Sequence, residues 1–172
     1  TGDCEFDAVT VTSGDTLDMN GQRMELSGVL TVPDGGVLDG DGLLIASNLN
    51  FDGNAPTNVT SCDLILTGSG SVDMENTAGI YRTLMFNGTS KFEPNNAHLL
   101  SGTNVIICNE VDCDSVSQTG PVNITVPTGG TLDGGSATIT CAGDFTTSGG
   151  LLGASCYNFD SSSDYFAYTP SI

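Results

Sequence analysis

The chain has 172 residues, of which 21 are Asp or Glu and only three, Arg23, Arg82 and Lys91, are basic, so its net charge is −18. This charge argues against nucleic acids, anionic lipids and other polyanions as partners. The length suits one domain, residues 1–172, with a sizeable core. Gly, Thr, Ser, Asn and Asp dominate while Lys and Glu are scarce, so we expect almost no helix.

The composition also indicates a secreted protein. Six cysteines, an even number, occur in a chain that is poor in Lys and rich in Thr and Ser, which is typical of an oxidising compartment. The chain begins with Thr1 rather than Met and contains no apolar run near 18 residues. We therefore expect a processed chain at the cell surface or outside the cell, without a membrane span.

A repeat organises the chain after its first few residues. Residues 1–8 are polar and acidic and show no amphipathic helix that could cover a first repeat unit. The pattern Thr10-Val11, with a later Gly, Leu and Asp, returns 21 residues on, in the stretch Val29–Gly42. Each unit has short apolar alternations between Gly-containing turns, and a period near twenty predicts a solenoid with one coil per unit.

Within such coils the alternate apolar side chains should point inward and stack into ladders. We expect the first unit to run from Val9 to Ser27 and the second to end near Phe51. The predicted inward residues of the repeat are Val11, Leu17, Met24, Leu26, Val32, Leu38, Leu43, Ile45, Leu49, Phe51, Val126 and Leu132.

The repeat is less regular between residues 52 and 120 and then returns. Strand-like segments persist there, and loops are expected at 52–56 and 93–100. Residues 124–136 repeat residues 30–42 with 8 identities in 13 positions, 94 residues later. We therefore predict an all-β fold, a single-stranded parallel β-helix or β-solenoid of roughly six to eight coils with inserted loops.

The last segment, residues 157–172, differs from the repeat. Four of the eleven Tyr and Phe residues follow position 158, whereas flexible tails are usually poor in aromatic residues. Its apolar side chains could add as a strand to a neighbouring subunit, or the tail could fold back and cap its own chain. The residues predicted to mediate such assembly are Tyr165, Phe166, Tyr168 and Ile172.

The two units Thr31–Gly40 and Thr125–Gly134 share the pattern Thr-Val-Pro-x-Gly-Gly-x-Leu-Asp-Gly. This pattern resembles the right-handed parallel β-helix superfamily, which includes pectate-lyase-like enzymes, phage tailspikes and adhesin passenger regions. The resemblance implies the fold and no particular activity. The hydrolases of that superfamily combine Asp clusters with Gly-His-Gly, and the lyases an Arg or Lys base with calcium-bound carboxylates. Here His98 lies between Ala and Leu and no basic motif matches, so we expect no catalytic residue and no enzyme.

Three aspartates, Asp34, Asp39 and Asp41, form the best candidate for a calcium site, because calcium prefers several oxygen ligands. The alternative is that they make turn hydrogen bonds, as the recurrence of Asp39 at Asp18 and Asp133 suggests. Three further acidic residues are expected to be solvated rather than metal-bound: Glu110, Asp112 and Asp114. No other cofactor is expected.

The cysteine spacing suggests three disulfide bonds among fifteen possible connectivities. Two pairs are close in sequence and the third takes what remains: Cys108 with Cys113, Cys141 with Cys156, and Cys4 with Cys62. A zinc site is disfavoured because the chain has one His and no Cys-x-x-Cys.

Sequons for N-linked glycans occur at Asn58, Asn87 and Asn123, and about three are expected by chance from the composition. Thr-x-Thr pairs at Thr10/Thr12 and Thr138/Thr140 raise an ice-binding alternative, but Pro33 and Pro127 interrupt the ladder.

These observations favour a secreted structural protein, a non-catalytic subunit of an extracellular filament or surface assembly that forms a homopolymer. The alternatives are a carbohydrate-binding adhesin module and, with less support, a polysaccharide lyase- or hydrolase-like or ice-binding β-helix.

Overall fold

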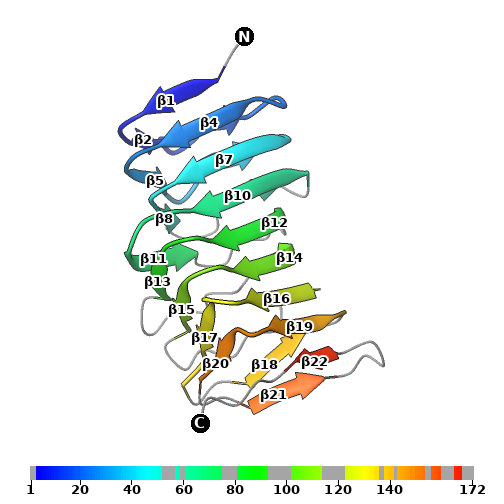
Figure 1. Cartoon of the computed structure of the whole chain (residues 1–172). Coiled ribbons are helices and arrows are strands. Elements are labelled where there is room, and N and C mark those ends of the chain that lie inside the picture. Colours follow the sequence, from blue (N-terminus) through cyan, green and yellow to red (C-terminus); the bar gives the residue numbers. More distant parts are fainter. Residues whose placement is uncertain are drawn as a thin grey trace.

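The computed structural model describes residues 3–51, 57–58, 61–74, 81–92, 102–113, 123–135, 138–141, 143–153, 156–159 and 165–167. In these ranges the chain forms 22 strands and no helix, which confirms the all-β prediction. The strands stack as coils along a rod, with β1 (Cys4–Phe6) at one end and β22 (Tyr165–Ala167) at the other (Figure 1).

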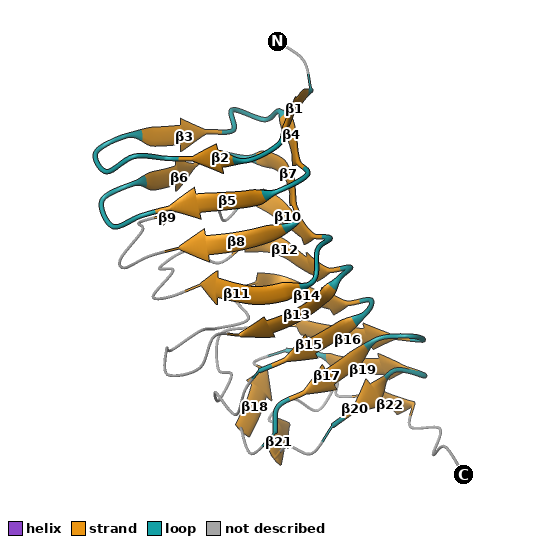
Figure 2. Ribbon diagram, turned by 90° about the vertical axis from the view of Figure 1, so that its left-hand side faces the viewer, coloured by secondary structure: helices purple, strands orange, loops and turns teal. Residues whose placement is uncertain are grey.

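The coils have three sides, and strands of successive coils pair in parallel on each (Figure 2). The first side is a nine-stranded sheet of β1 (Cys4–Phe6), β4 (Arg23–Leu26), β7 (Gly42–Ala46), β10 (Cys62–Leu66), β12 (Tyr81–Phe86), β14 (Gly102–Ile107), β16 (Asn123–Pro127), β19 (Phe145–Ser148) and β22 (Tyr165–Ala167). The second side is an eight-stranded sheet of β2 (Val9–Thr10), β5 (Val29–Val32), β8 (Asn48–Phe51), β11 (Gly70–Met74), β13 (Thr89–Phe92), β15 (Glu110–Asp112), β17 (Thr131–Asp133) and β20 (Leu151–Leu152).

The third side is described near the two ends of the rod. Near the N-terminus it consists of β3 (Thr16–Asp18), β6 (Val37–Asp39) and β9 (Thr57–Asn58), and near the C-terminus of β18 (Thr138–Cys141) and β21 (Cys156–Phe159). The predicted loops at 52–56 and 93–100 lie outside the described residues. Each coil contributes one strand to each long sheet, except that β22 has no described partner strand on the second side. The number of coils agrees broadly with the six to eight expected.

The core consists of inward ladders of apolar side chains, as the alternation predicts. Val11, Val32, Leu38, Val126 and Leu132 are buried, and Leu17 is half-buried beside Leu38. Parallel strands in register place equivalent residues about 4.8 Å apart, so each inward side chain packs on the coils above and below.

The inward assignment of β7 was wrong by one residue. Leu44 and Ala46 are buried, whereas Leu43 and Ile45 point outward and are half-buried. The run Leu43 to Ala46 is apolar in both alternating phases, so the pattern alone does not choose a face. Pairing decides it, because Leu44 lies opposite Met24 of the preceding coil and Leu64 of the next.

The first coil also begins earlier than expected. Cys4–Phe6 already forms a strand of the nine-stranded sheet, in register with Met24–Leu26. The prediction that the first unit starts at Val9 therefore missed one side of the first coil. The sequence signal for this first strand was Glu5, which recurs as Glu25 in the next coil.

The two best copies of the repeat lie on different sides of the coil. In the first, Val29–Val32 belongs to the eight-stranded sheet, and in the second, Asn123–Pro127 belongs to the nine-stranded sheet. Val32 accordingly pairs with Phe51, and Val126 with Thr147. Val32 and Val126 occupy equivalent places in the repeat and were both predicted to point inward into stacked ladders, but they belong to different ladders.

The same turn nevertheless joins the strands of both copies. The Gly36 N–H donates to the Pro33 carbonyl oxygen at 2.9 Å, and the Gly130 N–H to the Pro127 carbonyl oxygen, also at 2.9 Å. The preceding glycine has a positive φ in each, 81° at Gly35 and 92° in the second copy. Such a backbone favours glycine because it has no Cβ.

Candidate functional site

The N-terminal end of the rod presents a strand edge. β1 pairs with β4 alone among the described strands. The Ser27 N–H donates to the Phe6 carbonyl oxygen at 3.0 Å, so the main-chain groups of Phe6 point toward β4. Because successive residues of a strand alternate in direction, the N–H and C=O of Glu5 point to the outer edge. Phe6 is 46% exposed, so apolar surface accompanies this edge.

A shallow depression lies beside that strand. It is lined by side chains of the first and second coils, namely Glu5, Phe6, Asp7, Glu25 and Ser27. Four of these residues are acidic or polar and one is aromatic, so the depression offers a mixed contact surface rather than an enclosed ligand cavity.

The C-terminal end carries β22, the strand that contains two of the predicted assembly residues. Tyr165 pairs with Thr146, and Phe166 with Thr147, in parallel within the same chain. In this structure the strand therefore continues its own sheet, which corresponds to the alternative in which the tail folds back. Tyr168 and Ile172 lie outside the described residues. On the adjacent sheet the last strand, β20, exposes 54% of Leu151.

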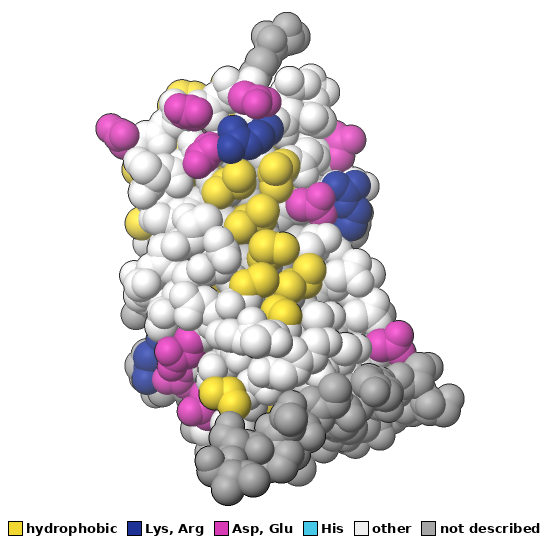
Figure 3. All heavy atoms as spheres, viewed as in Figure 1, with side chains coloured by type: hydrophobic (Ala, Val, Ile, Leu, Met, Phe, Trp, Pro, Cys, Tyr) yellow, Lys and Arg dark blue, Asp and Glu magenta, His cyan; other side chains and the backbone are white. Residues whose placement is uncertain are grey.

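An apolar ladder runs along the middle of the outer face of the nine-stranded sheet, over β7 to β14 (Figure 3). We call these residues the outward apolar ladder: Leu43, Ile45, Ile65, Met85 and Ile106. The last four stack in register on β7, β10, β12 and β14, and all five are half-buried. Sequence reasoning missed this surface. The signal was the set of uninterrupted apolar triplets, such as Leu64-Ile65-Leu66, where an outward polar residue is expected.

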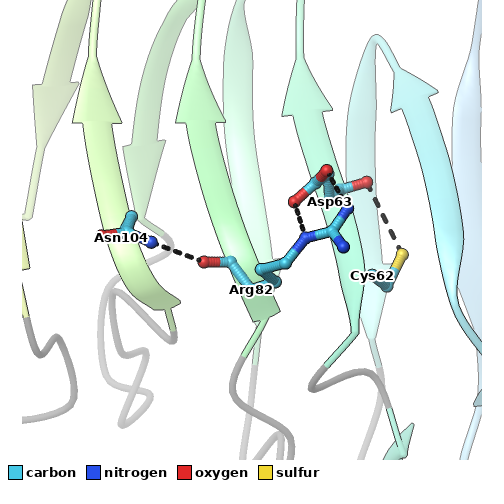
Figure 4. Close-up of polar contacts among 4 residues, drawn as sticks. All are labelled: Cys62, Asp63, Arg82 and Asn104. Atoms are coloured by element: carbon cyan, nitrogen blue, oxygen red, sulfur yellow. Dashed lines mark hydrogen bonds and ion pairs between the residues drawn. The ribbon is translucent and has the colours of Figure 1, made fainter.

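Ion pairs border this ladder. Arg82 binds Asp63 with two hydrogen bonds, from Nε to Oδ1 at 2.9 Å and from Nη2 to Oδ2 (Figure 4). These bonds lower the pKa of the Asp63 carboxyl. Nearer the N-terminus Arg23 pairs with Glu25 and lies 3.9 Å from the Asp3 carboxylate.

Asparagine side chains continue the border toward the C-terminus. The Asn104 amide donates to the Arg82 carbonyl oxygen at 3.2 Å (Figure 4), and the Asn123 amide donates to Asn104 Oδ1 at 3.0 Å. Asn123 Oδ1 accepts from the Asp144 N–H at 2.9 Å. These bonds join four successive coils and help to fix their register.

The three calcium candidates do not come together as a metal site. Asp39 Oδ1 accepts from the Gly40 N–H at 2.7 Å, while Asp34 and Asp41 are exposed. The equivalent Asp18 and Asp133 accept from backbone N–H groups two residues on, each at 2.9 Å. In the described part of the chain no three His, Cys, Asp or Glu side chains form a group that could hold a metal ion. The turn interpretation therefore accounts for Asp39 and its equivalents Asp18 and Asp133.

The segment between Cys108 and Cys113 is a strand rather than a loop. Glu110–Asp112 forms β15, and Asp112 pairs with Lys91 at 3.1 Å. Asp114 lies outside the described residues.

This strand separates the first predicted cysteine pair. Cys108 lies at the corner before β15 and Cys113 is buried after it, and both are free thiols. The three extended residues of β15 alone span about 10 Å, which places the two cysteines beyond the reach of a disulfide, for which Cα atoms lie within about 7 Å.

The other two predicted pairs also fail geometrically. Cys62 is a free, buried thiol in β10, and β4 and β7 lie between its strand and that of Cys4. Cys141 pairs with Phe159, and Cys156 with Thr138, so the last two cysteines are three positions out of register. That offset corresponds to about 11 Å between Cα atoms. Sequence proximity was misleading because an intervening strand separates the first pair and the strand register separates the last pair.

The predicted sequons differ in their surroundings. Asn87 is exposed at the corner after β12. The amide of Asn123 donates within the asparagine ladder, so a glycan on its Nδ2 would compete with that bond. The side chain of Asn58 lies outside the described set, although its backbone ends β9. Glycosylation itself stays a prediction.

Comparison with known proteins gives no relative: no family model, no curated protein and no solved structure matches the chain. In the described ranges no helix is long and apolar enough to cross a membrane.

Proposed function

We propose that the chain is a non-catalytic structural subunit that polymerises end to end into an extracellular filament or surface assembly. One observation carries this proposal: both long sheets end, at each end of the rod, in a strand that has a single neighbour among the described strands. These strands are β1 and β2 at the N-terminal end and β22 and β20 at the C-terminal end. Unpaired strand edges readily pair with strands of another molecule.

The two ends are compatible with each other. All strand pairs in the two long sheets are parallel, so stacking one copy on the next continues the same pairing. Such a contact joins two different surfaces, and head-to-tail contacts that do not close into a ring form open filaments. The exposed Phe6, which is in register with the buried Leu26, would be covered in this arrangement.

Charge opposes this assembly at low ionic strength. Each copy carries a net charge of −18, and Asp3, Glu5 and Asp7 lie at the N-terminal end. Salt screens exposed charges beyond about 8 Å at physiological ionic strength. Polymerisation is therefore expected to increase with salt concentration.

The location outside the cell and the absence of catalysis rest on composition and on the missing motifs, and they belong to this proposal. So does membership of the right-handed parallel β-helix superfamily, which rests on the Thr-Val-Pro-x-Gly-Gly pattern. A carbohydrate-binding adhesin module remains the alternative, and it predicts glycan binding by the monomer.

The proposal is tested by substituting Glu5→Pro. Proline removes the outward-pointing N–H of the edge strand without removing a bond to β4, and proline is tolerated on sheet edges. We expect wild-type chains to form filaments at physiological salt in electron micrographs, and Glu5→Pro chains to remain short or monomeric.

The matched control is Glu5→Gln, which removes the same charge and keeps the N–H, and which should polymerise at least as well as the wild type. Filaments of unchanged length in Glu5→Pro would contradict pairing through β1. A wild-type chain that stays monomeric at high concentration and physiological salt would reject assembly.

A further inference from the structure

The outward apolar ladder is a continuous apolar surface on the described part of the chain. Ile45, Ile65, Met85 and Ile106 occupy four adjacent strands in register, so the ladder extends over about 14 Å along the rod. Leu43 widens it at one end, and Thr83, Thr125 and Thr146 lie around it on the same face. An apolar centre with a polar rim is the usual anatomy of a protein–protein interface.

The charges around the ladder cancel, while Glu5 of β1, in register with Glu25, lies farther along the same face. Along the sheet from β4 to β16 the described charged residues are Arg23, Glu25, Asp63 and Arg82, two basic and two acidic. The third side, by contrast, carries none of the three basic residues of the chain. Near β3 and β6 it carries five acidic residues: Asp15, Asp18, Asp34, Asp39 and Asp41. For a partner that is itself strongly negative, the neutral face is the one that can be approached at low electrostatic cost.

A second copy of this chain is such a partner, and its own neutral face complements the first. Two nine-stranded sheets can face each other with the rods running in opposite directions. A twofold axis then lies between the two sheets, parallel to the strands and midway between β10 and β12. Ile65 of one copy then lies opposite Met85 of the other, and Ile45 opposite Ile106. Sheets packed face to face lie about 10 Å apart, which suits interdigitated side chains of this size.

The same axis aligns the charges. Asp63 is in register with Thr83, next to Arg82, so Asp63 of each copy faces the Arg82 region of the other. If the rods ran in the same direction, the twofold axis would place the Asp63 and Arg82 side chains of the two copies at opposite edges of the interface. Asp63 of one copy would then not face the Arg82 region of the other. Self-complementary patches of this kind are typical of twofold dimers.

We propose that the outward apolar ladder binds a second copy of this chain laterally, as an antiparallel face-to-face dimer. This contact uses the side of the rod and is independent of the end-to-end contact proposed above. It supplies a route by which single filaments associate in pairs.

The test is the association state of Glu5→Pro chains at physiological salt, measured by sedimentation velocity, since this background removes end-to-end growth. We expect a monomer–dimer equilibrium. Adding Ile65→Glu should weaken the dimer at least about tenfold, because it places a charge in the apolar centre of the interface.

The matched control is Val29→Glu, which makes a comparable change at a 36% exposed position on the adjacent sheet and should leave the dimer unchanged. Circular dichroism establishes that each variant is folded. Equal weakening by Val29→Glu and Ile65→Glu would overturn the proposal. A Glu5→Pro chain that is already monomeric would also overturn the proposal. That result is expected if the ladder binds another segment of a longer chain or a different molecule.

Charge reversal tests the orientation. Asp63→Arg should weaken the dimer, and the double variant Asp63→Arg with Arg82→Asp should restore it, because reciprocal pairing is then recovered. A single variant that dimerises like the wild type, or a double variant that stays as weak as the single one, would reject the antiparallel arrangement.

Discussion

The two copies of the repeat motif, residues 30–42 and 124–136, share eight of thirteen residues and form the same turn on different sides of the coil. In the first copy the turn connects the eight-stranded sheet to the third side, and in the second it connects the nine-stranded sheet to the eight-stranded sheet. The motif therefore encodes a corner rather than a position in the coil. Which corner it forms depends on the lengths of the segments between the copies.

The surroundings of the two corners differ because different coils pack against them. A Cβ atom added at Gly130 would lie 1.9 Å from the Ile107 carbonyl oxygen of the preceding coil. At the equivalent Gly36 the nearest atoms, in Pro33 and Val32, would be 3.1 Å away. The same repeated pattern is therefore packed tightly against the preceding coil at Gly130 and less tightly at Gly36.

The largest expected effect follows from this difference. Gly130→Ala should lower the free energy of unfolding by about 3 kcal/mol or more, because backbone atoms must move. Gly36→Ala should cost about 1 kcal/mol, since small shifts relieve its contacts. Urea unfolding followed by circular dichroism measures both. Equal losses would show that the neighbouring coil does not determine the tolerance of the corner.

A second, smaller effect concerns the glycine with positive φ that both copies share. Gly129 has a φ of 92° and no atom lies within 4 Å of an added Cβ, so Gly129→Ala tests backbone conformation alone. The expected loss is about 1–2 kcal/mol. Gly129→Asn should cost less, because Asn tolerates positive φ better than Ala. An Asn variant no more stable than the Ala variant would contradict a conformational origin.

Between the two copies, Cys108 lies at a corner, whereas Cys62 and Cys113 are buried. Their reactivity toward a thiol reagent distinguishes these positions. Burial raises the pKa of Cys62 to about 11 and that of Cys113 to about 12. At pH 8 the native protein should therefore react with a thiol reagent at the half-buried Cys108 far faster than at either buried thiol. Unfolding in urea should equalise the rates.

The same shifts predict the sign of an alkaline effect. The unfolded chain releases these two protons near pH 9 and the folded chain only near pH 11 to 12. Stability should thus be unaffected by these groups below pH 9 and fall as the pH rises above it. Fast native-state labelling of Cys62 and Cys113 would contradict their inward placement, and a Cys108–Cys113 disulfide in unreduced peptides would contradict the course of β15.

The fold could be predicted from the sequence because period, turn glycines and alternation all agree. Prediction failed where one of these signals was ambiguous. The run Leu43 to Ala46 is apolar on both faces, so only pairing with Met24 assigns it, and the outward apolar ladder was hidden by the same ambiguity. The cysteine pairs failed because a solenoid places residues about twenty apart side by side, while nearby residues such as Cys108 and Cys113 lie at opposite ends of one strand, β15.

The central claim, end-to-end stacking of solenoids, is tested most directly by fibre diffraction from aligned native filaments. Strands lie across the rod and repeat along it at about 4.8 Å. Head-to-tail stacking continues that repeat from one copy to the next, so we predict a sharp reflection near 4.8 Å along the filament axis. Filaments with this reflection perpendicular to the axis would contradict the claim.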